Sequence, residues 1–308
     1  MSIKILHKGL ADSLQDNGRY GFQHLGIPPN GCMDILSASL ANYILQNESN
    51  TPVVELHFPS SKIQFLEDAI ICVTGANFVP VVNEKSIALN TPICVYQNDV
   101  LTMMQPLEGS IAYLAIKGKY DAPLWLNSQA YNGSRIDTND ILPFSSAQHF
   151  NTNTAKHLNE ILNHERIEKN QNNLFSNNTP IRILPGPAWQ DLSPKSIHDL
   201  INSTFTISKQ RNRMGYHLLG PELNLIIPNA YLSSAVTMGT LQLLPNGNVI
   251  VLMADHQTIG GYANLAQIIL VDLPRFAQMK SGVSFKLNIT NLETAQRLYK
   301  EMYAPFKH

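Results

Sequence analysis

Residues 248–262 read NVIVLMADHQTIGGY. The first seven are mostly apolar and rich in β-branched side chains, which predicts a buried strand. The next eight bring an acid, an amide, a hydroxyl group and two adjacent glycines to the end of that strand. Polar groups gathered at such a point suit a binding site, and paired glycines let backbone approach a ligand closely or take φ > 0. A tight turn capped by Asp255 explains the same residues equally well.

Short strands separated by turns extend in both directions from this stretch. Valine, isoleucine and tyrosine dominate them, and Gly, Asn or Asp bound them. Hairpin turns are predicted at Asn98-Asp99 and at Glu108-Gly109. The predicted strands cover residues 70–74, 78–82, 92–96, 110–116, 181–184, 204–208, 249–253, 266–271 and 283–288. Many short strands with few helices favour barrels or sandwiches over a βαβ fold.

Three helices are predicted between these strands. Asp34 is a candidate N-cap for an apolar stripe that begins at Ile35. A second helix is expected over residues 155–167, inside a segment rich in Asn, His and Gln. A third follows Thr290-Asn-Leu-Glu293, which has the form of a capping box. The polar segment 146–179 predicts a junction between an N-terminal domain, 1–145, and a C-terminal domain, 180–308.

Composition excludes several classes of protein. The chain has 308 residues and a net charge of -1, and it carries no basic arm that would indicate nucleic-acid binding. It lacks an apolar run long enough for a membrane span. Its N-terminus has no secretory h-region, and its three cysteines form no CxxC pair, so we expect a cytoplasmic protein with reduced thiols.

Common catalytic motifs are missing from the sequence. It has no Walker loop, no GxGxxG after a strand and no GxSxG elbow. The histidines are scattered, which argues against a zinc site and leads us to expect no bound metal on this chain. Met279-Lys280 suggests biotin attachment only faintly, because the second Met of that motif is absent.

Three further segments carry candidate binding residues. In 14–21, Arg19 can clamp a carboxylate, or Asp16 can simply cap a turn. In 26–34, two prolines and two glycines feed the helix that starts at Asp34, whose N-terminus favours an anion. In 211–220, two arginines flank an amide, as they also would in a solvated basic turn.

These segments together resemble the biotin-dependent carboxyltransferase family, also called allophanate hydrolase subunit 2, whose members include KipA and the C subunit of 5-oxoprolinase. The resemblance runs from about residue 9 to 285. The matching pieces, in order, are SLQDNGRYG, GIPPNGCMD, LANYILQN, VVELHF, ILPGP, RNRMGYHLLGPEL, MGTLQLLPNG and VIVLMADHQTIGGYANLAQIILVDL.

The resemblance implies a mainly β fold of two tandem cyclophilin-like barrels with a few short helices. It implies a cytoplasmic, heteromeric, ATP-dependent 5-oxoprolinase, in which this chain works with two partners, the A subunit plus a KipI-like B subunit. ATP with magnesium would serve the assembled complex, no biotin would be attached here, and the chain would be inactive alone. It also implies two alternatives: a carboxyltransferase module for a urea-like acceptor, or a regulator that binds a KipI-like protein without turnover.

Site residues carry over from the family segment Asp-x-Gln-Thr-x-Gly-Gly-Tyr. By this resemblance Asp255 orients a group or accepts a proton, Gln257 holds an amide oxygen, and Thr258 completes the catalytic set. Substrate-binding roles fall to Arg213, Gln242, Gly260, Gly261 and Tyr262, with Asp16, Arg19 and Asp34 contributing from the other domain.

The chain departs from the family pattern in three places. Asn127-Ser128-Gln129-Ala130 stands where the family often has a Gly-Ser-Arg-Ser-like element, so one arginine is lost. Arg211 and His217 stand where Ser and Arg are usual. Only one glycine remains near Gly118, where a pair is expected. These changes bear on the substrate more than on the fold.

Overall fold

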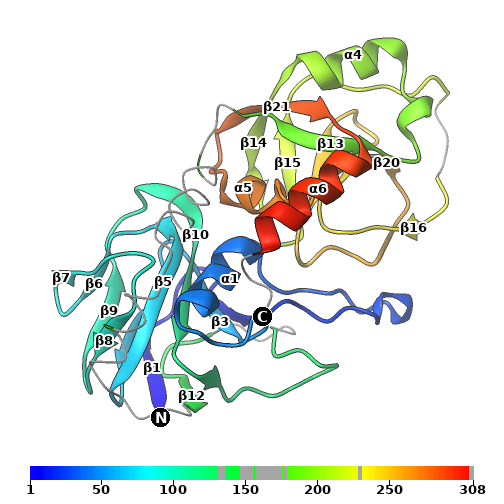
Figure 1. The fold of residues 1–308 in the computed structure, drawn as a ribbon. Coiled ribbons are helices and arrows are strands. Elements are labelled where there is room, and N and C mark those ends of the chain that lie inside the picture. The colour runs from blue at the N-terminus through cyan, green and yellow to red at the C-terminus, as the bar shows by residue number, and fades with distance from the viewer. Residues whose placement is uncertain (131–135, 146–155, 157–174, 176–178, 228–230, 305–308) are drawn as a thin grey trace. The chain divides into compact units, whose positions relative to one another are not determined.

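The computed structural model describes residues 1–130, 136–145, 156, 175, 179–227 and 231–304. The chain divides into two compact units (Figure 1). The first comprises residues 1–19 and 30–173 together with 306–308, and the second comprises 20–29 and 174–305. Among the described residues, no helix combines the length and the apolar character needed to cross a membrane.

Two antiparallel sheets build the first unit. One has the strand order β11-β12-β1-β4-β9-β6-β7, and the other has the order β2-β3-β10-β5-β8. The strands are β1 Ser2–His7, β2 Ser13–Gln15, β3 Val53–His57, β4 Lys62–Phe65, β5 Ala69–Asn77, β6 Pro80–Val82, β7 Lys85–Ser86, β8 Ile93–Val95, β9 Val100–Met103, β10 Glu108–Ile116, β11 Lys119–Tyr120 and β12 Ile141–Ser145.

The five-stranded sheet has one apolar face and one mixed face, because neighbouring residues of a strand point to opposite sides. Leu14, Val54 and Leu114 belong to the buried apolar core of this unit, together with Ile3 and Phe65 of the other sheet. The alternate positions of β2, β3 and β10 carry the buried polar side chains of Ser13, Gln15 and Glu55 beside apolar ones such as Val53 and Ile111. Helix α1, Ile35–Ile44, contacts β5 and β10.

A closed barrel forms the second unit, with the strand order β13-β20-β17-β18-β15-β14-β21. Parallel pairing of β13 with β21 closes the barrel. Strands β16 and β19 form a separate two-stranded sheet. The elements are β13 Ile181–Pro185, η2 Trp189–Asp191, α4 Pro194–Asn202, β14 Thr204–Arg211, β15 Gly215–Leu219, β16 Ser234–Ala235, β17 Thr240–Leu243, β18 Val249–Leu252, β19 Ile259–Gly260, β20 Ala263–Ile268, α5 Leu273–Gln278, β21 Ser284–Ile289 and α6 Leu292–Tyr303; η1 is Gln23–Leu25.

The structure confirms the mainly β architecture, and every predicted strand overlaps an observed one. The N-cap role of Asp34 is also confirmed, because its side chain accepts a 2.9 Å hydrogen bond from the Ser37 backbone N–H. The helix expected at 155–167 lies outside the described residues apart from Lys156.

Three local predictions are corrected. Glu108-Gly109 is no hairpin turn but the start of β10, where the register with β5 shifts and Gly109 takes a φ of 74°. Asn98-Asp99 does turn the chain, but it joins β8 to β9, which pair with different strands. Asn291 caps α6 in place of Thr290, since its side chain accepts from the Thr294 N–H.

Candidate functional site

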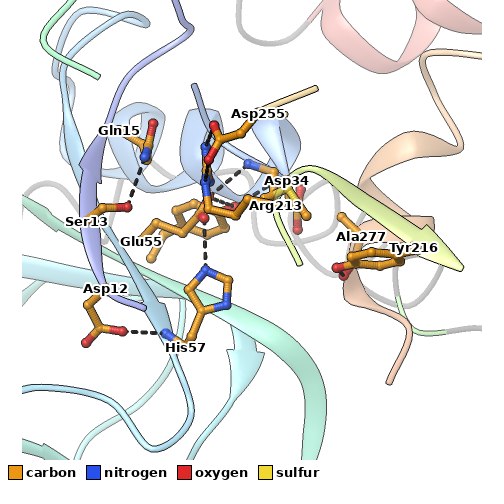
Figure 2. A network of polar contacts seen from close by, with 12 residues as sticks. Asp12, Ser13, Gln15, Asp34, Glu55, His57, Arg213, Tyr216, Asp255 and Ala277 are labelled. Atoms are coloured by element: carbon orange, nitrogen blue, oxygen red, sulfur yellow. Dashed lines mark hydrogen bonds and ion pairs between the residues drawn. The ribbon is translucent and has the colours of Figure 1, made fainter. Parts of the chain in front are cut away.

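Arg213 and Asp255 form a bidentate pair in the second unit (Figure 2). Arg213 lies in the turn between β14 and β15, and Asp255 follows β18, the neighbour of β15 in the barrel. Nε and Nη2 of Arg213 each donate a 2.8 Å hydrogen bond to a separate oxygen of Asp255. The Asp255 backbone N–H also donates to the Arg213 carbonyl at 2.8 Å. Three contacts therefore fix the beginning of the segment 255–262.

This pair changes what its two members can do. Their side chains are only 11% and 18% exposed, so their attraction is weakly screened by solvent. The family resemblance gives Arg213 a substrate-binding role, whereas two of its nitrogen donors here bind Asp255. The fork-to-fork geometry holds both charges in place, which favours an orienting role for Asp255 over a proton-accepting one.

A cluster of amide side chains joins the segment 255–262 to the barrel strands β17 and β20. Gln242 of β17 is almost fully buried, and its Nε2 donates to Oδ1 of Asn264 of β20 at 2.9 Å. Asn264 in turn donates to the hydroxyl of Ser234 at 3.0 Å. Gln257 Nε2 lies 3.4 Å from Gln242 Oε1. We call Gln242, Gln257 and Asn264 the amide cluster; sequence reasoning found the first two and missed Asn264.

The two glycines of the segment differ in their surroundings. A Cβ atom on Gly260 would lie 2.6 Å from Nε2 of Gln242 and 3.3 Å from Nε2 of Gln257, so a larger residue there would displace the side-chain amides of the cluster. A Cβ atom on Gly261 would meet nothing closer than 3.5 Å. The structure thus brings Gly260 to the cluster and leaves Gly261 on an open edge.

The remaining residues of the segment frame this cluster. Thr258 is buried, and its carbonyl accepts from the Val236 N–H at 3.2 Å. Tyr262 is 44% exposed. His256, which sequence reasoning passed over, is buried, and Nδ1 lies 2.6 Å from the Gln257 carbonyl oxygen. Because a carbonyl only accepts, Nδ1 is the donor, and burial lowers the pKa of the imidazole.

Asp16 acts as an anchor within the first unit. Its carboxylate accepts hydrogen bonds from the Gly18 N–H at 2.8 Å, the Ser128 hydroxyl at 2.7 Å and the Gln129 N–H at 2.7 Å. The contacts join the turn after β2 to the divergent element 127–130. Residues 127–130, which depart from the family pattern, are therefore held to Asp16 by the Ser128 hydroxyl and the Gln129 backbone N–H.

Arg19 and Asp34 also make scaffold contacts. Arg19 is 2% exposed; Nη1 donates to Asn30 Oδ1 at 2.6 Å, Nη2 donates to the Ala130 carbonyl at 2.5 Å, and the guanidinium lies 4.8 Å from the Trp125 ring centroid. Asp34 caps α1 through the N–H and the hydroxyl of Ser37. Asp16, Arg19 and Asp34 belong to the first unit, while the other predicted site residues belong to the second.

Sequence reasoning also missed a buried polar group on β3. Glu55 is fully buried, and it contacts Tyr113 and His57. The signal was present in the chain, because an acid and a histidine at alternate positions of an apolar strand are rarely buried without partners.

Comparison of the chain with known proteins identifies its family. Residues 25–289 match the carboxyltransferase domain family, subdomains A and B. Since this match spans most of the chain, the protein belongs to that family, as its resemblance predicted.

Relatives in this family match nearly the whole chain, but the matched part is a different share of each relative's own length. The C subunit of 5-oxoprolinase from Haemophilus influenzae is 29% identical over 300 residues, which is 97% of this chain and 94% of the relative. The Escherichia coli protein of the same name is 28% identical over 314 residues, with 99% and 96% coverage. Urea amidolyase of Lachancea kluyveri is 26% identical over 96% of this chain, which spans only 17% of that relative.

Solved structures support the fold. The K. lactis urea amidolyase superposes with a TM-score of 0.85 at 23% identity, over 99% of this chain and 20% of that chain. The Kluyveromyces lactis urea carboxylase gives 0.84 at 24% identity, over 99% and 29%. The chain thus spans less than a third of either structure.

Proposed function

We propose that this chain is the C subunit of an ATP-dependent 5-oxoprolinase, which opens 5-oxoproline to glutamate together with the A and B subunits. One observation supports the proposal most strongly: the match to the Haemophilus influenzae C subunit covers 97% of this chain and 94% of that relative. The match to a urea amidolyase uses a small part of that longer relative.

The amide cluster supplies chemistry that suits a cyclic amide. Primary amides both donate and accept hydrogen bonds, so Gln257 can hold the ring carbonyl oxygen while Gln242 and Asn264 keep the cluster aligned. Negative charge develops on that oxygen when the carbonyl is attacked, and fixed N–H donors stabilise it. Asp255, held by Arg213, sets the backbone from which Gln257 projects.

Cofactor and partner assignments follow from the same proposal. Among the described residues, no three His, Cys, Asp or Glu side chains converge to form a metal site. By the family resemblance we assign ATP and its magnesium ion to the assembled complex. The partners are the A subunit plus a KipI-like B subunit, the complex is cytoplasmic, and this chain carries no covalent biotin.

A second candidate is carboxyl transfer to a urea-like acceptor. The similarity to urea amidolyase over 96% of this chain favours it, and a ureido group presents the same carbonyl and N–H pattern to the amide cluster. It requires a biotin carrier, either on another chain or on a fused carboxylase. A non-catalytic, KipA-like regulator that binds a KipI-like protein is the remaining alternative.

Reconstitution separates these candidates. Purified chain is mixed with the A and B subunits, and glutamate and ADP are measured with 5-oxoproline as substrate. A parallel mixture contains urea and a biotinylated carrier. Turnover of 5-oxoproline supports the proposal, turnover of urea alone supports carboxyl transfer, and tight binding of the B subunit without turnover of either supports the regulator.

A further inference from the structure

The amide cluster forms a chain of hydrogen bonds that all run in one direction. Gln257 Nε2 faces Gln242 Oε1 at 3.4 Å, and Gln242 Nε2 donates to Asn264 Oδ1 at 2.9 Å. Asn264 Nδ2 then donates to the Ser234 hydroxyl at 3.0 Å. Each amide therefore donates toward Ser234 and accepts from the side of Gln257, and linked bonds of this kind polarise one another. All four residues belong to the second unit.

A β-bulge in β20 brings Asn264 into this chain. Leu241 of β17 pairs with Ala266, but the next residue, Gln242, pairs with Asn264, so β20 contains one extra residue, Leu265. In an unbroken register Leu265 would lie opposite Gln242. Bulges re-aim side chains, and this one places a side-chain acceptor beside the buried amide of Gln242.

The segment that follows β13 holds the bulge in place. The Ala188 N–H donates to the Asn264 carbonyl at 3.0 Å, and the Gly186 N–H donates to the Leu265 carbonyl at 2.8 Å. A Cβ atom on Gly186 would lie 2.6 Å from the Asn264 carbonyl oxygen, which is backbone and cannot swing aside as a side-chain tip can. The position of Asn264 is therefore set by backbone contacts as well as by its own side chain.

Gln257 is the solvent-facing end of the chain. Gln242 and Asn264 are buried, whereas Gln257 is half-buried. Its Nε2 carries a second hydrogen besides the one that faces Gln242, and within the described part of the chain its Oε1 accepts no hydrogen bond. A chain running the other way would occupy Oε1 and leave two N–H donors. The observed direction gives Gln257 both a donor and an acceptor for a ligand.

A donor and an acceptor on one amide match the edge of a cis amide. In a five-membered lactam the ring holds N–H and C=O on the same side. The lactam carbonyl can then accept from Gln257 Nε2 while the lactam N–H donates to Gln257 Oε1. A ureido group presents the same edge. An open-chain secondary amide is trans, so its N–H and C=O point in opposite directions and cannot make both bonds to one side chain.

We propose that Gln257 binds a cis amide through this pair of hydrogen bonds, and that Asn264 is the positioning residue that sets the direction of the chain, an inference that rests on the 5-oxoprolinase function. The ligand class is a lactam or a ureido group. Recognition then depends on the ligand N–H as well as on its carbonyl oxygen.

Binding of three small probes to the complete mixture of the three proteins tests the pairing by ligand-detected NMR. 2-Pyrrolidinone carries the cis edge, N-methyl-2-pyrrolidinone keeps the ring and carbonyl without the N–H, and N-methylacetamide carries both groups in trans. Each control probe loses one of the two bonds, so 2-pyrrolidinone should bind roughly 10-fold more tightly than either. Equal or tighter binding of a control probe, or no binding of 2-pyrrolidinone, would overturn the pairing.

Two substitutions at Asn264 test its positioning role. Asn264→Asp keeps the acceptor for Gln242 Nε2 and cannot donate, so the chain keeps its direction and the affinity for 2-pyrrolidinone should stay close to wild type. Asn264→Leu has a similar size but no acceptor, and the affinity should fall roughly 10-fold. Asn246→Asp, at an exposed position between β17 and β18, controls for the added charge. Wild-type affinity in Asn264→Leu, or equal losses in both Asn264 variants, would overturn this role.

Turnover of 5-oxoproline in the same mixture distinguishes the two proposals. Selective binding of 2-pyrrolidinone without turnover would contradict the 5-oxoprolinase function and support the pairing with a cis amide. Displacement of the probe by 5-oxoproline would identify a lactam as the natural ligand, and displacement by urea alone would identify a ureido group. Turnover with unselective binding of the probes would overturn the pairing and leave the function intact.

Discussion

Arg213 and Asp255 lie 42 residues apart in the chain and meet through two parallel hydrogen bonds of 2.8 Å. The antiparallel pairing of β15 with β18 brings their backbones together. The pair lies at the start of the segment that carries Gln257, Thr258 and Gly260. It therefore fixes the backbone that positions the Gln257 side chain in the amide cluster.

Asp255→Asn should therefore reduce both stability and activity. Asparagine offers one acceptor oxygen and no charge, which removes the bidentate carboxylate from the largely buried Arg213 guanidinium. We expect the free energy of unfolding to fall by roughly 1.5–3 kcal/mol in urea titration, with loss of 5-oxoproline turnover. Glu301→Gln, in the exposed Arg297–Glu301 pair, should change it by less than about 0.5 kcal/mol.

A double-mutant cycle checks the cause. Asp255→Asn and Arg213→Gln should together cost less than the sum of the single changes, with a coupling of roughly 0.5–3 kcal/mol. Additive losses would show that each side chain is stabilised by other contacts.

The two glycines of the segment allow a comparison of neighbouring positions. Gly260→Ala should push the Gln242 and Gln257 amides out of alignment, because the new methyl would lie 2.6 Å from Gln242 Nε2. Turnover should fall by about 10²-fold, as a misplacement near 1 Å typically costs. Side-chain tips can move, so the thermal midpoint should change little. In Gly261→Ala the new methyl would make only ordinary contacts, at 3.5 Å or more, so this variant should retain activity; equal activity of the two variants would contradict a role for the amide cluster.

Asp34 can be tested as a helix cap. Asp34→Ala removes the acceptor for the Ser37 N–H, and the expected loss is about 1–2 kcal/mol of unfolding free energy. Asp34→Ser restores a capping oxygen and should recover most of it. Asn291→Ala, the matched change at the exposed cap of α6, should cost roughly 1 kcal/mol or less. If Asp34→Ser were stable but inactive in the complex, Asp34 would contact a ligand and not only cap α1.

His256 should make stability depend on pH. Burial lowers its pKa below the ordinary 6.5, so the unfolded chain binds a proton before the folded one does as the pH falls. The contribution to stability is full above about 6.5 and is lost as the pH drops toward the folded pKa, by at most about 1.4 kcal/mol per pH unit.

Urea titrations between pH 7 and pH 5 measure this slope. His256→Asn keeps an N–H for the Gln257 carbonyl but does not titrate, so its slope should be smaller than that of wild type. His24→Asn, at an exposed position of η1, is the matched control. Identical slopes for wild type and His256→Asn would mean that the folded imidazole charges freely.

Features set by a few neighbouring residues could be predicted from the sequence. The cap at Asp34 needs only a helix start and the Ser37 N–H, and the strand at 249–252 needs only its apolar run. The capping box at Thr290 was misassigned by one residue because Asn291 is an equally good cap.

Features set by strand register could not be predicted in this way. The Arg213–Asp255 pair, the contact of Gln242 with Asn264, and the contact of Glu55 with Tyr113 all join residues far apart in the chain. A shift of one residue would place strand residues such as Gln242 and Glu55 on the opposite face of the sheet. The start of β10 at Gly109 shows the same limit, since a glycine suits a turn and a bulge alike.

The assignment as the C subunit of 5-oxoprolinase is tested most directly by omission and add-back. The A and B subunits are incubated with 5-oxoproline and ATP, and glutamate and ADP are followed as this chain is titrated in. We predict negligible turnover without the chain and a rate that rises until the chain equals its partners in amount. A rate that is the same with and without the chain would contradict the proposed function.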